Sequence, residues 1–541
     1  MRITPITLQY QNALIHDYRN QKPEILAHFD YDPYSGTSYQ MRAQALQDKQ
    51  IDRQHLTKTL AAMNRRWDAP ETTYRHIERL KDDNSVVVIG GQQAGLLTGP
   101  MYTINKIISI IQLAKQQETK LQIPVVPVFW IAGEDHDFEE INHVFLPENN
   151  HMKKYKLEQR VSDKSPVSNI SIDRSAAAQW VDQLFTQLTE TAHTKSLYQT
   201  IQDCLQQSDT YVDFFARVIH RLFDDEGIVL ADSGDPAMRK MERKHFITLI
   251  ENQRKISSGV YTALQQLNQK GYTVTLEADP DDAHLFYHLG DNRILLTRDD
   301  EGNWAGKQQE VLLTTEEIMD TVKNNPEMLS NNVVTRPIMQ ECLFPTLAFI
   351  GGPGEVGYWS ALKPAFQAVG MEMPPVVPRL SFTFIDRHLE KLLHKFGIDE
   401  EKAINDGVNP LKIKWLAAQN GPPVEQVAAE IRRVIDTAHK PLRDIARGIR
   451  SDLGELADKN LYYLNEDIKY LEDRIMKGLE EKHTMQLNEF DRIQNTIHPR
   501  NGLQERTWNP LPWLNVYGSD FIKELTNQRC SFAEEHHIVY L

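Results

Sequence analysis

The segment VVVIGGQQAGLLTGPMYTINK, residues 86–106, joins an apolar run to a glycine-rich bend and then to a helical pattern. A short run of β-branched residues that ends in glycine is typical of a strand buried on both faces. Beyond the bend, apolar residues recur at helical spacing from Ile104 to Ile111, and Pro100 suits the first turn of a helix. A second apolar run, IPVVPVFWIAGEDHD (residues 123–137), follows. The segment therefore predicts a strand–helix–strand unit and a parallel sheet.

The same strand and bend pattern recurs along the chain. GIVLADSGDP (residues 227–236) and PTLAFIGGPGEVGYWSALKPAF (345–366) each place an apolar run before a bend, and MPPVVPRLSFTFID (373–386) is the last candidate strand. Residues 1–83 and about 147–225 have helical patterns, and alternation over about 272–313 predicts a small antiparallel sheet. The predicted fold class is α/β, with a parallel-sheet core over residues 1–384 that carries the helical and β insertions.

A different pattern begins after Asp386. Apolar residues separated by three or four positions run from Val427 to Ile449 and from Leu461 to Ile475, with charges between them. This spacing is that of a coiled coil, and two such arms in one chain predict an antiparallel helical hairpin. Residues 385–541 are therefore expected to form an α-helical coiled-coil domain. Its aromatic, proline-rich tail is expected to pack back on the core.

Composition restricts the class of protein. The chain has 541 residues and a net charge of −15, which disfavours nucleic acid as a partner because phosphates need a basic surface. Its cysteines, Cys204, Cys342 and Cys530, lie far apart, so neither a thiolate zinc site nor a disulfide framework is expected. That usage favours a reducing cytoplasm. No apolar stretch approaches the length of a membrane span, so no membrane partner is expected.

The glycine-rich bend is the first candidate site. Glycines let a backbone approach a ligand closely, and the helix that follows offers unpaired N–H groups to a phosphate or carboxylate. The spacing is neither G-x-G-x-x-G nor a Walker loop, and a tight structural turn is the alternative. Lys106 lies two helical turns further on and would reach a bound anion, unless it is simply solvated. The candidate cofactor-binding residues are Gly90, Gly91, Gln92, Gln93, Gly95, Thr98, Gly99 and Lys106.

The second candidate site is the acidic turn after the second strand, Glu134, Asp135, His136 and Asp137. Carboxylates and an imidazole at the end of a buried strand are costly unless they face solvent, a cation or a substrate amine. They would suit a Mg²⁺ ion carried by a nucleotide, and His136 would serve as a general base. The structural alternative is an acidic helix N-cap.

Further candidates lie around a third glycine bend. Glu355, Tyr358 and Trp359 follow this bend, where the aromatic rings would stack on an adenine or a sugar or fill the core. Two arginines in proline-bracketed apolar settings each need an anionic partner, either a buried carboxylate or a ligand. The candidate substrate-binding residues are Trp130, Arg336, Glu355, Tyr358, Trp359 and Arg379. Near the C-terminus, Gln504, Glu505 and Arg506 either bind a nucleotide or tie the tail down, and no metal site is expected at His536 and His537.

Together GGQQAGLLTGPMYTINKI, VFWIAGEDHDFEEIN, GGPGEVGYW and NGLQER resemble the bacillithiol biosynthesis cysteine-adding enzymes. The resemblance extends over essentially the whole chain. It implies a Rossmann-like core with connecting-peptide insertions, similar to class I aminoacyl-tRNA synthetases, followed by a C-terminal coiled coil. It also implies that L-cysteine is joined through an amide to the amine of glucosaminyl-malate, with bound ATP or ADP, a role for Mg²⁺ and a homodimer.

The resemblance also has departures from the synthetases. Thr98, Gly99, Pro100 and Met101 stand where those enzymes carry their His-Ile-Gly-His signature, and neither histidine is present. PRLSF stands near the position of the second, lysine-rich signature, but no lysine-rich loop follows Arg379. These departures disfavour a cysteinyl-adenylate, and without a thiolate zinc site cysteine must be recognised in another way.

The resulting hypothesis is an amide-forming ligase. The glycine bend would hold anions and the acidic turn an ammonium group or Mg²⁺, with His136 or Asp137 as the base toward the sugar amine. Arg336, Arg379 or Lys106 would meet the malate carboxylates. A non-catalytic, nucleotide-binding coiled-coil assembly protein is the alternative, which the missing histidines favour and the acidic turn disfavours.

Overall fold

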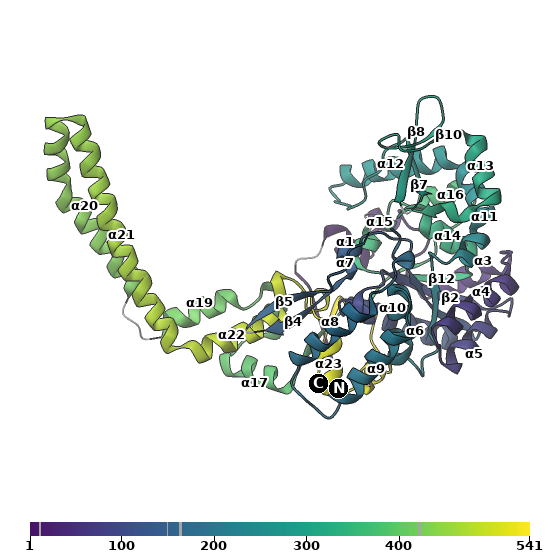
Figure 1. Ribbon diagram of the computed structural model, residues 1–541, viewed down its shortest axis with the longest axis horizontal. Helices are drawn as coiled ribbons and strands as arrows, with labels where there is room; N and C mark the ends of the chain where they lie inside the picture. The colour runs from purple at the N-terminus through teal and green to yellow at the C-terminus, as the bar shows by residue number, and fades with distance from the viewer. Residues whose placement is uncertain (10–11, 149, 162–164, 291, 420–422) are drawn as a thin grey trace. The chain divides into compact units, whose positions relative to one another are not determined.

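A five-stranded sheet, with strand order β13-β12-β2-β3-β6, confirms the α/β fold class in the computed structural model (Figure 1). Every neighbouring pair of strands is parallel. Nearly every residue of these strands is buried, as expected for apolar runs covered on both faces. The strands are β2 (Val86–Gln92), β3 (Val125–Ile131), β6 (Val229–Asp232), β12 (Thr346–Gly351) and β13 (Val376–Pro378).

The structure describes residues 1–9, 12–148, 150–161, 165–290, 292–419 and 423–541. They divide into two units. The first comprises Met1–Glu148, Met152–Asp386 and Gly502–Leu541, and the second comprises Asn149–His151 and Arg387–Asn501. The last 40 residues thus belong to the first unit, whereas a division at residues 384 and 385 would leave them with the coiled coil.

The connection from β2 to β3 contains a tightly constrained bend. It passes through η1 (Leu96–Thr98) and α6 (Tyr102–Leu121), so the helix begins two residues beyond Pro100. Leu97, Thr98 and Gly99 all have positive φ, at 47°, 73° and 69°. The side-chain amide of Asn509 holds this conformation by donating to the carbonyl oxygens of Leu97 (2.9 Å) and Gly99 (2.7 Å).

The part of the chain that precedes the parallel sheet is mostly helical. The expectation of an all-helical start was wrong for Arg2–Ile6, which forms β1. That strand pairs antiparallel with β15, so its pairing partner is about 530 residues away and was invisible to a local pattern. The helices that follow are α1 (Ala13–Arg19), α2 (Pro23–Leu26), α3 (Ser38–Gln47), α4 (Arg53–Arg66) and α5 (Glu71–Arg79).

The insertion expected over residues 147–225 begins with strands rather than with a helix. In His143–Glu148 and His151–Lys156 buried side chains are interspersed with partly or fully exposed ones, which is the pattern of a ribbon covered on one face. Beyond it the helical expectation is confirmed. The elements are α7 (Phe138–Ile141), β4 (His143–Glu148), β5 (His151–Lys156), η2 (Val167–Asn169), α8 (Arg174–Thr186), α9 (Thr194–Gln206) and α10 (Tyr211–Leu222).

The small antiparallel sheet is also present, with strand order β10-β9-β8-β7-β11. It begins at Asp282 rather than at Tyr272, because residues 272–278 adopt no regular structure despite their alternation. The elements of this region are α11 (Pro236–Glu251), α12 (Gln253–Gln269), β7 (Asp282–Leu289), β8 (Asn292–Arg298), β9 (Trp304–Gly306), β10 (Leu312–Leu313), α13 (Thr315–Asn324), η3 (Pro326–Met328), β11 (Leu329–Asn331), α14 (Thr335–Leu343), α15 (Pro353–Trp359) and α16 (Lys363–Ala368).

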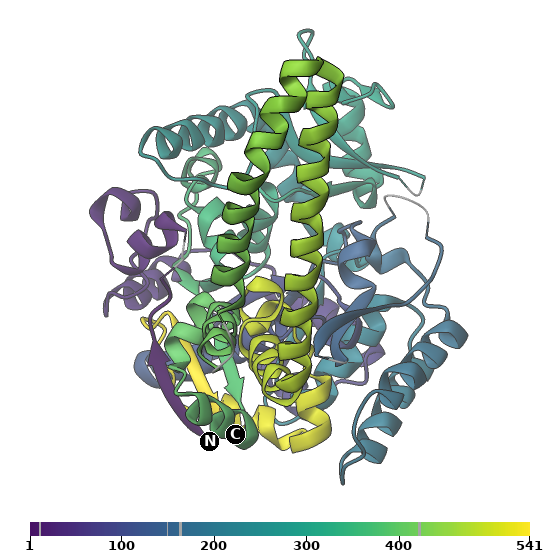
Figure 2. The same cartoon turned by 90° about the vertical axis from the view of Figure 1, so that its left-hand side faces the viewer.

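The second unit is helical and contains the expected hairpin. Its long helices α20 (Val424–Ile449) and α21 (Ser451–Lys482) lie side by side over most of their length (Figure 2). Many of the apolar heptad residues remain exposed, among them Ile445 (61%) and Leu471 (56%). The other elements are α17 (Arg387–Phe396), α18 (Glu400–Asp406), α19 (Asn409–Ala418), α22 (Thr484–Ile497) and η4 (Pro499–Asn501).

The C-terminal tail packs on the first unit, as its composition predicts. Its last strand, β15 (His536–Tyr540), lies between β1 and β14 (Phe382–Ile385), and both ends of the chain lie near each other (Figure 1). The preceding elements are η5 (Gln504–Arg506), α23 (Leu511–Tyr517) and α24 (Asp520–Thr526). Within the described residues, no helix combines the length and the apolar composition that a bilayer crossing requires.

We predict that Ile538→Ala destabilises the first unit strongly. Ile538 is 2% exposed in the central strand of the three-stranded sheet, so truncation leaves a cavity costing about 2–5 kcal/mol. Urea unfolding monitored by circular dichroism would measure the loss. Val516→Ala in α23, where Val516 is 51% exposed, should change the free energy of unfolding by no more than about 0.5 kcal/mol. Equal effects of the two variants would contradict this account of the tail.

Candidate active site at the carboxyl edge of the parallel sheet

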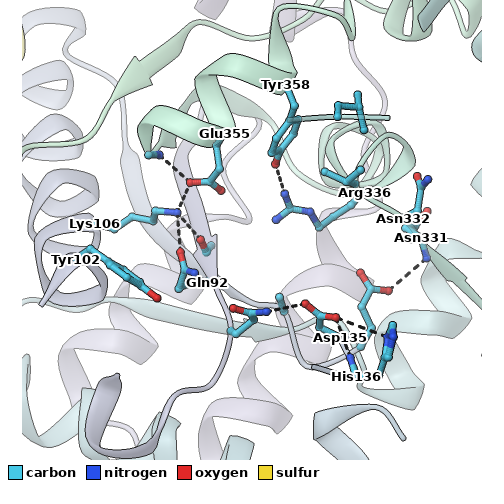
Figure 3. Close-up of a pocket in the computed structure, with 18 of the residues that line it drawn as sticks. Gln92, Tyr102, Lys106, Asp135, His136, Asn331, Asn332, Arg336, Glu355 and Tyr358 are labelled. Carbon is cyan, nitrogen blue, oxygen red and sulfur yellow. Dashed lines mark hydrogen bonds and ion pairs between the residues drawn. The ribbon is translucent and has the colours of Figure 1, made fainter. Parts of the chain in front are cut away.

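A cavity of about 700 Å³ opens where β2, β3 and β12 end, the edge at which open parallel sheets bind ligands (Figure 3). Residues from the small antiparallel sheet and from the C-terminal tail complete its walls. It brings together many of the predicted residues: Gly91, Gln92, Gln93, Lys106, Glu134, Asp135, His136, Arg336, Glu355, Tyr358, Arg379 and Arg506.

Lys106 is buried in this wall and is fully engaged. Its ammonium group donates to the Gly91 carbonyl oxygen (2.6 Å) and the Gln92 side-chain oxygen (3.2 Å), and it forms an ion pair with Glu355. Burial lowers the pKa of Lys106, and the Glu355 carboxylate opposes that shift. Glu355 also accepts from the Gly352 N–H (2.7 Å) at the start of α15. Lys106 thus ties α6 to α15 rather than standing free for an anion.

Asp135 faces the opposite wall and remains one-third exposed. One of its oxygens accepts from the Gln93 amide (2.8 Å), and the other accepts from the His136 N–H (2.8 Å) and lies 3.7 Å from Arg293. The Arg293 guanidinium also lies 3.4 Å from His136 Nδ1. The acidic turn is therefore a charged, hydrogen-bonded group open to the cavity.

Glu134 is almost fully buried at the back of the cavity. Its Oε2 forms an ion pair with Arg239 of α11 and accepts from the Asn331 N–H (3.3 Å). Arg239 also donates to Glu242 (2.6 Å), so one guanidinium lies between two buried carboxylates. Burial raises the pKa of Glu242 to about 7, with a further contribution from Glu134, while Arg239 opposes it.

Two guanidinium groups of the cavity have no carboxylate partner within the described residues. Arg336 donates to the hydroxyl of Tyr358, a phenol whose pKa burial raises to about 12, so the group stays neutral (Figure 3). Arg506 is exposed at the wall and forms no ion pair with another described residue. Arg379, by contrast, is bound bidentately by Glu505, with both N–O distances at 2.7 Å. Arg336 and Arg506 are therefore the cations open to an anionic ligand.

Other predicted residues lie outside the cavity. Trp130 and Trp359 are core residues: Trp130 packs edge-on against Phe344, and Trp359 stacks on Phe349 with ring centroids 4.2 Å apart. Gln504 is buried and pairs with both backbone groups of Phe384. These three assignments to ligand binding are corrected to packing, the alternative considered for Trp359 and Gln504.

The glycine bend is likewise mainly structural. A side chain at Gly90 would come within 2.8 Å of the Ile350 carbonyl oxygen, and one at Gly95 within 2.9 Å of Gly99, so both glycines serve close packing. Gly95, Thr98 and Gly99 do not line the cavity. Asp137 is exposed at the N-cap of α7, outside the cavity, and makes no capping hydrogen bond. Only the start of the bend, Gly91 to Gln93, faces the site.

Sequence reasoning missed several residues of the site. Arg293 comes from β8, Asn331 from the end of β11 and Arg239 from α11, all elements of the later part of the chain. Arg239 had one local signal, since a charged residue three positions before Glu242 on a helix can form an ion pair with it. Arg293 and Asn331 lie in segments without a recognisable motif. Only the folded structure shows that they are close to the acidic turn.

The donor set decides which cofactors fit. Among the described residues, no three carboxylate, histidine or cysteine groups converge as a metal cage. A magnesium ion carried by a nucleotide would not need such a cage, because it is usually bound by one or two carboxylates and the phosphates. The cysteines are buried separately, in α9, in α14 and beyond α24, and burial raises the pKa of each thiol. They take no part in the site.

Comparisons with known proteins agree with the resemblance seen in the sequence. Residues 1–380 match the family described as "Bacillithiol biosynthesis BshC, N-terminal Rossmann-like domain", and residues 382–541 match its "C-terminal coiled-coil domain". The chain is 42% identical over 548 residues to a protein of Oceanobacillus iheyensis and 40% identical over 541 residues to one of Bacillus licheniformis, with each pair covered completely. A Bacillus cereus protein is 39% identical over 531 residues, 98% of both chains.

All three relatives carry the name "Putative cysteine ligase BshC". Their names confirm the expected class of enzyme, a ligase, and the two matched domains confirm a Rossmann-like core followed by a coiled coil. Because both family matches together span the chain almost without a gap, the protein belongs to the bacillithiol biosynthesis BshC family.

Proposed function

We propose that the protein joins L-cysteine through an amide to the amine of glucosaminyl-malate, the last step of bacillithiol synthesis. The name of the relatives supports cysteine as one substrate. The observation that carries the proposal is that one cavity holds groups of both charges: the guanidinium groups of Arg336 and Arg506, which lack carboxylate partners, and the carboxylates of the acidic turn. A substrate that has both carboxylates and an amine matches this combination.

Amide formation needs two things from this site. The amine must lose a proton before its lone pair attacks the cysteine carboxyl carbon, and the carboxyl oxygen must leave with an activating group. Asp135 and His136 lie together on the exposed part of the acidic turn, so we assign them to receive the proton. Asp137 is left out of this role because it lies outside the cavity.

We further propose that a nucleotide supplies the activation, with ATP as the activating agent and Mg²⁺ carried by it. Gln93 and the exposed guanidinium of Arg506 would hold its phosphates, because Lys106 is already occupied by Glu355. Arg336, which lies beside Tyr358, is then left for the malate carboxylates.

The activity predicts a specific product. Purified protein incubated with L-cysteine, glucosaminyl-malate, Mg²⁺ and ATP should form the amide, detected by mass spectrometry together with AMP or ADP. Since general-base catalysis contributes about 10²–10⁴-fold, His136→Ala should slow product formation by at least about 100-fold. AMP would indicate an adenylate, and ADP an acyl phosphate.

Glu140→Gln is the matched control for this assay. Glu140 is an exposed acid in α7, four residues from His136, and it does not line the cavity. The variant should retain the wild-type rate. A folded wild-type protein that forms no amide would refute the proposed reaction and favour the non-catalytic assembly protein.

We predict that Arg336 recognises the malate part. Arg336→Ala should raise the KM for glucosaminyl-malate by about 10-fold or more, since a hydrogen bond to a charged group contributes about 1.5–3 kcal/mol. Glucosamine, which lacks the malate carboxylates, should be used equally poorly by the wild type and the variant. A KM for glucosaminyl-malate that does not change would assign the malate to another part of the cavity.

We also propose that the hairpin of α20 and α21 pairs with a second copy of the chain. Its exposed apolar heptad residues form the kind of surface that monomeric proteins rarely leave in water. Leu471→Asp should therefore reduce the mass measured by light scattering from twice 62.4 kDa to 62.4 kDa. Lys477→Glu, at an exposed charged position of the same helix, should leave the dimer intact, and a wild-type monomer would contradict the pairing.

A further inference from the structure

The Asn331 side chain is an anomaly in the cavity wall. It is 2% exposed, yet both its amide nitrogen and its amide oxygen lack a hydrogen-bond partner among the described residues. The residue lines the cavity at the end of β11 (Figure 3), and its backbone N–H donates to Glu134 (3.3 Å). Leaving two buried polar atoms unsatisfied costs free energy, so this amide is arranged for a partner that comes from outside the chain. That partner must accept one hydrogen bond and donate another.

Glu134, beside it, also keeps one oxygen available. Arg239 and the Asn331 N–H both bind Oε2, whereas Oε1 has no hydrogen-bond partner within the described part of the chain. Because Arg239 and the backbone hold the carboxylate from behind, its position is fixed before any ligand arrives. A preorganised carboxylate oxygen next to an unpaired amide is a site for a group that donates several hydrogen bonds.

The free acceptor atoms indicate the sign of that group. The Oε1 atom of Glu134 and the amide oxygen of Asn331 both face the cavity without a donor, and one of them belongs to a carboxylate. Arg239 does not serve Glu134 alone, because its guanidinium is shared with Glu242. A positively charged donor would complete the interactions of both acceptors.

We propose that Glu134 and Asn331 form an ammonium subsite that receives the α-ammonium group of the L-cysteine substrate. This inference rests on the proposed function. An α-amino acid carries its ammonium group next to a carboxylate, so it can donate to Glu134 and to the Asn331 amide oxygen while accepting from the amide nitrogen.

The chemistry of the reaction assigns the subsite to this amine rather than to the sugar amine. The amine that attacks must lose a proton, and a fixed, buried carboxylate favours the protonated form of whatever amine it binds. The α-amine of cysteine takes no part in the amide bond, so it stays protonated throughout. Glu134 therefore binds the unreactive amine, and Arg239 and Glu242 are positioning residues that act through it.

Competition between two thiols tests the subsite directly. L-cysteine and 3-mercaptopropionate differ only in the amino group, and their dissociation constants can be measured by calorimetry with the full-length protein. The wild type should bind L-cysteine on the order of 10-fold or more tightly, because a charge-assisted hydrogen bond is worth about 1.5–3 kcal/mol. In Glu134→Gln and in Asn331→Leu this preference should fall to within about threefold.

Two further variants separate local charge from general charge. Glu277→Gln removes an exposed carboxylate from the same cavity and should leave the preference unchanged. Glu242→Gln removes a carboxylate that cannot touch the ligand, since Glu242 is fully buried behind Arg239, and it leaves the Arg239 guanidinium to Glu134. It should reduce the preference and raise the KM for L-cysteine while changing kcat less, which a merely structural role would not do.

The outcomes separate this inference from the proposed function. If the wild type forms the amide but binds both thiols equally, the ammonium subsite is wrong and the ligase activity is supported. The same conclusion follows if the amide forms and both Glu134→Gln and Asn331→Leu keep the full preference for L-cysteine. If the preference is present and is lost in these variants but no amide forms, the subsite is right and the reaction is wrong. Thermal unfolding of each variant confirms that it is folded, and Glu134→Gln, which keeps the shape of the side chain, provides the test if Asn331→Leu does not fold.

Discussion

A buried ion pair between Arg379 and Glu505 holds the first unit together. Arg379 follows β13 and Glu505 lies in the tail, so the pair joins segments separated by the entire second unit. Asn105 of α6 donates to the same carboxylate (2.7 Å), which adds the helix of the glycine bend to the junction. Burial alone would raise the pKa of Glu505, but Arg379 and these hydrogen bonds lower it overall, so the charge is kept.

This junction explains why the tail belongs to the site rather than to the hairpin. Arg506 follows Glu505 directly, so the ion pair delivers its guanidinium to the cavity wall. Asn509, three residues later, holds the left-handed backbone at Leu97 and Gly99. A chain without this ion pair would lose both the Arg506 guanidinium from the cavity wall and the hydrogen bonds of Asn509 that hold the bend. Removing one partner of such a pair costs about 3–5 kcal/mol, because the other charge is left buried and alone.

The predictable parts of the fold are those that follow from the residue pattern of a short segment. The apolar runs ending at Gly91 and Ile131 identified the strands, and the acidic turn after Ile131 placed charge at the edge where ligands bind. Arg336 and Arg379 stood out because an arginine in an apolar setting needs an anion. The sequence could not show which of the two arginines pairs with a carboxylate of the chain, since the partner of Arg379 lies 126 residues away.

The remainder depended on contacts between distant segments. A strand buried on both faces has no polar side to give its orientation, so nothing in the run ending at Ile131 revealed that Trp130 packs on Phe344. Asn331 lies in a three-residue strand whose register with β7 sets its place in the cavity wall. Strand pairing of this kind is long-range and leaves little trace in a single sequence.

The acidic turn shows how folding separates residues that look equivalent. Glu134 and Asp135 are neighbours with the same charge, but Glu134 turns inward to Arg239, and Asp135 stays one-third exposed beside Gln93. A carboxylate fixed by a guanidinium keeps its charge and its position, which suits binding. A carboxylate next to an imidazole at the open side of a cavity can exchange a proton with a ligand, which suits catalysis. The proposed reaction holds one amine protonated and deprotonates another, so it needs both environments within one active site, and we assign them to two consecutive residues at the end of one strand.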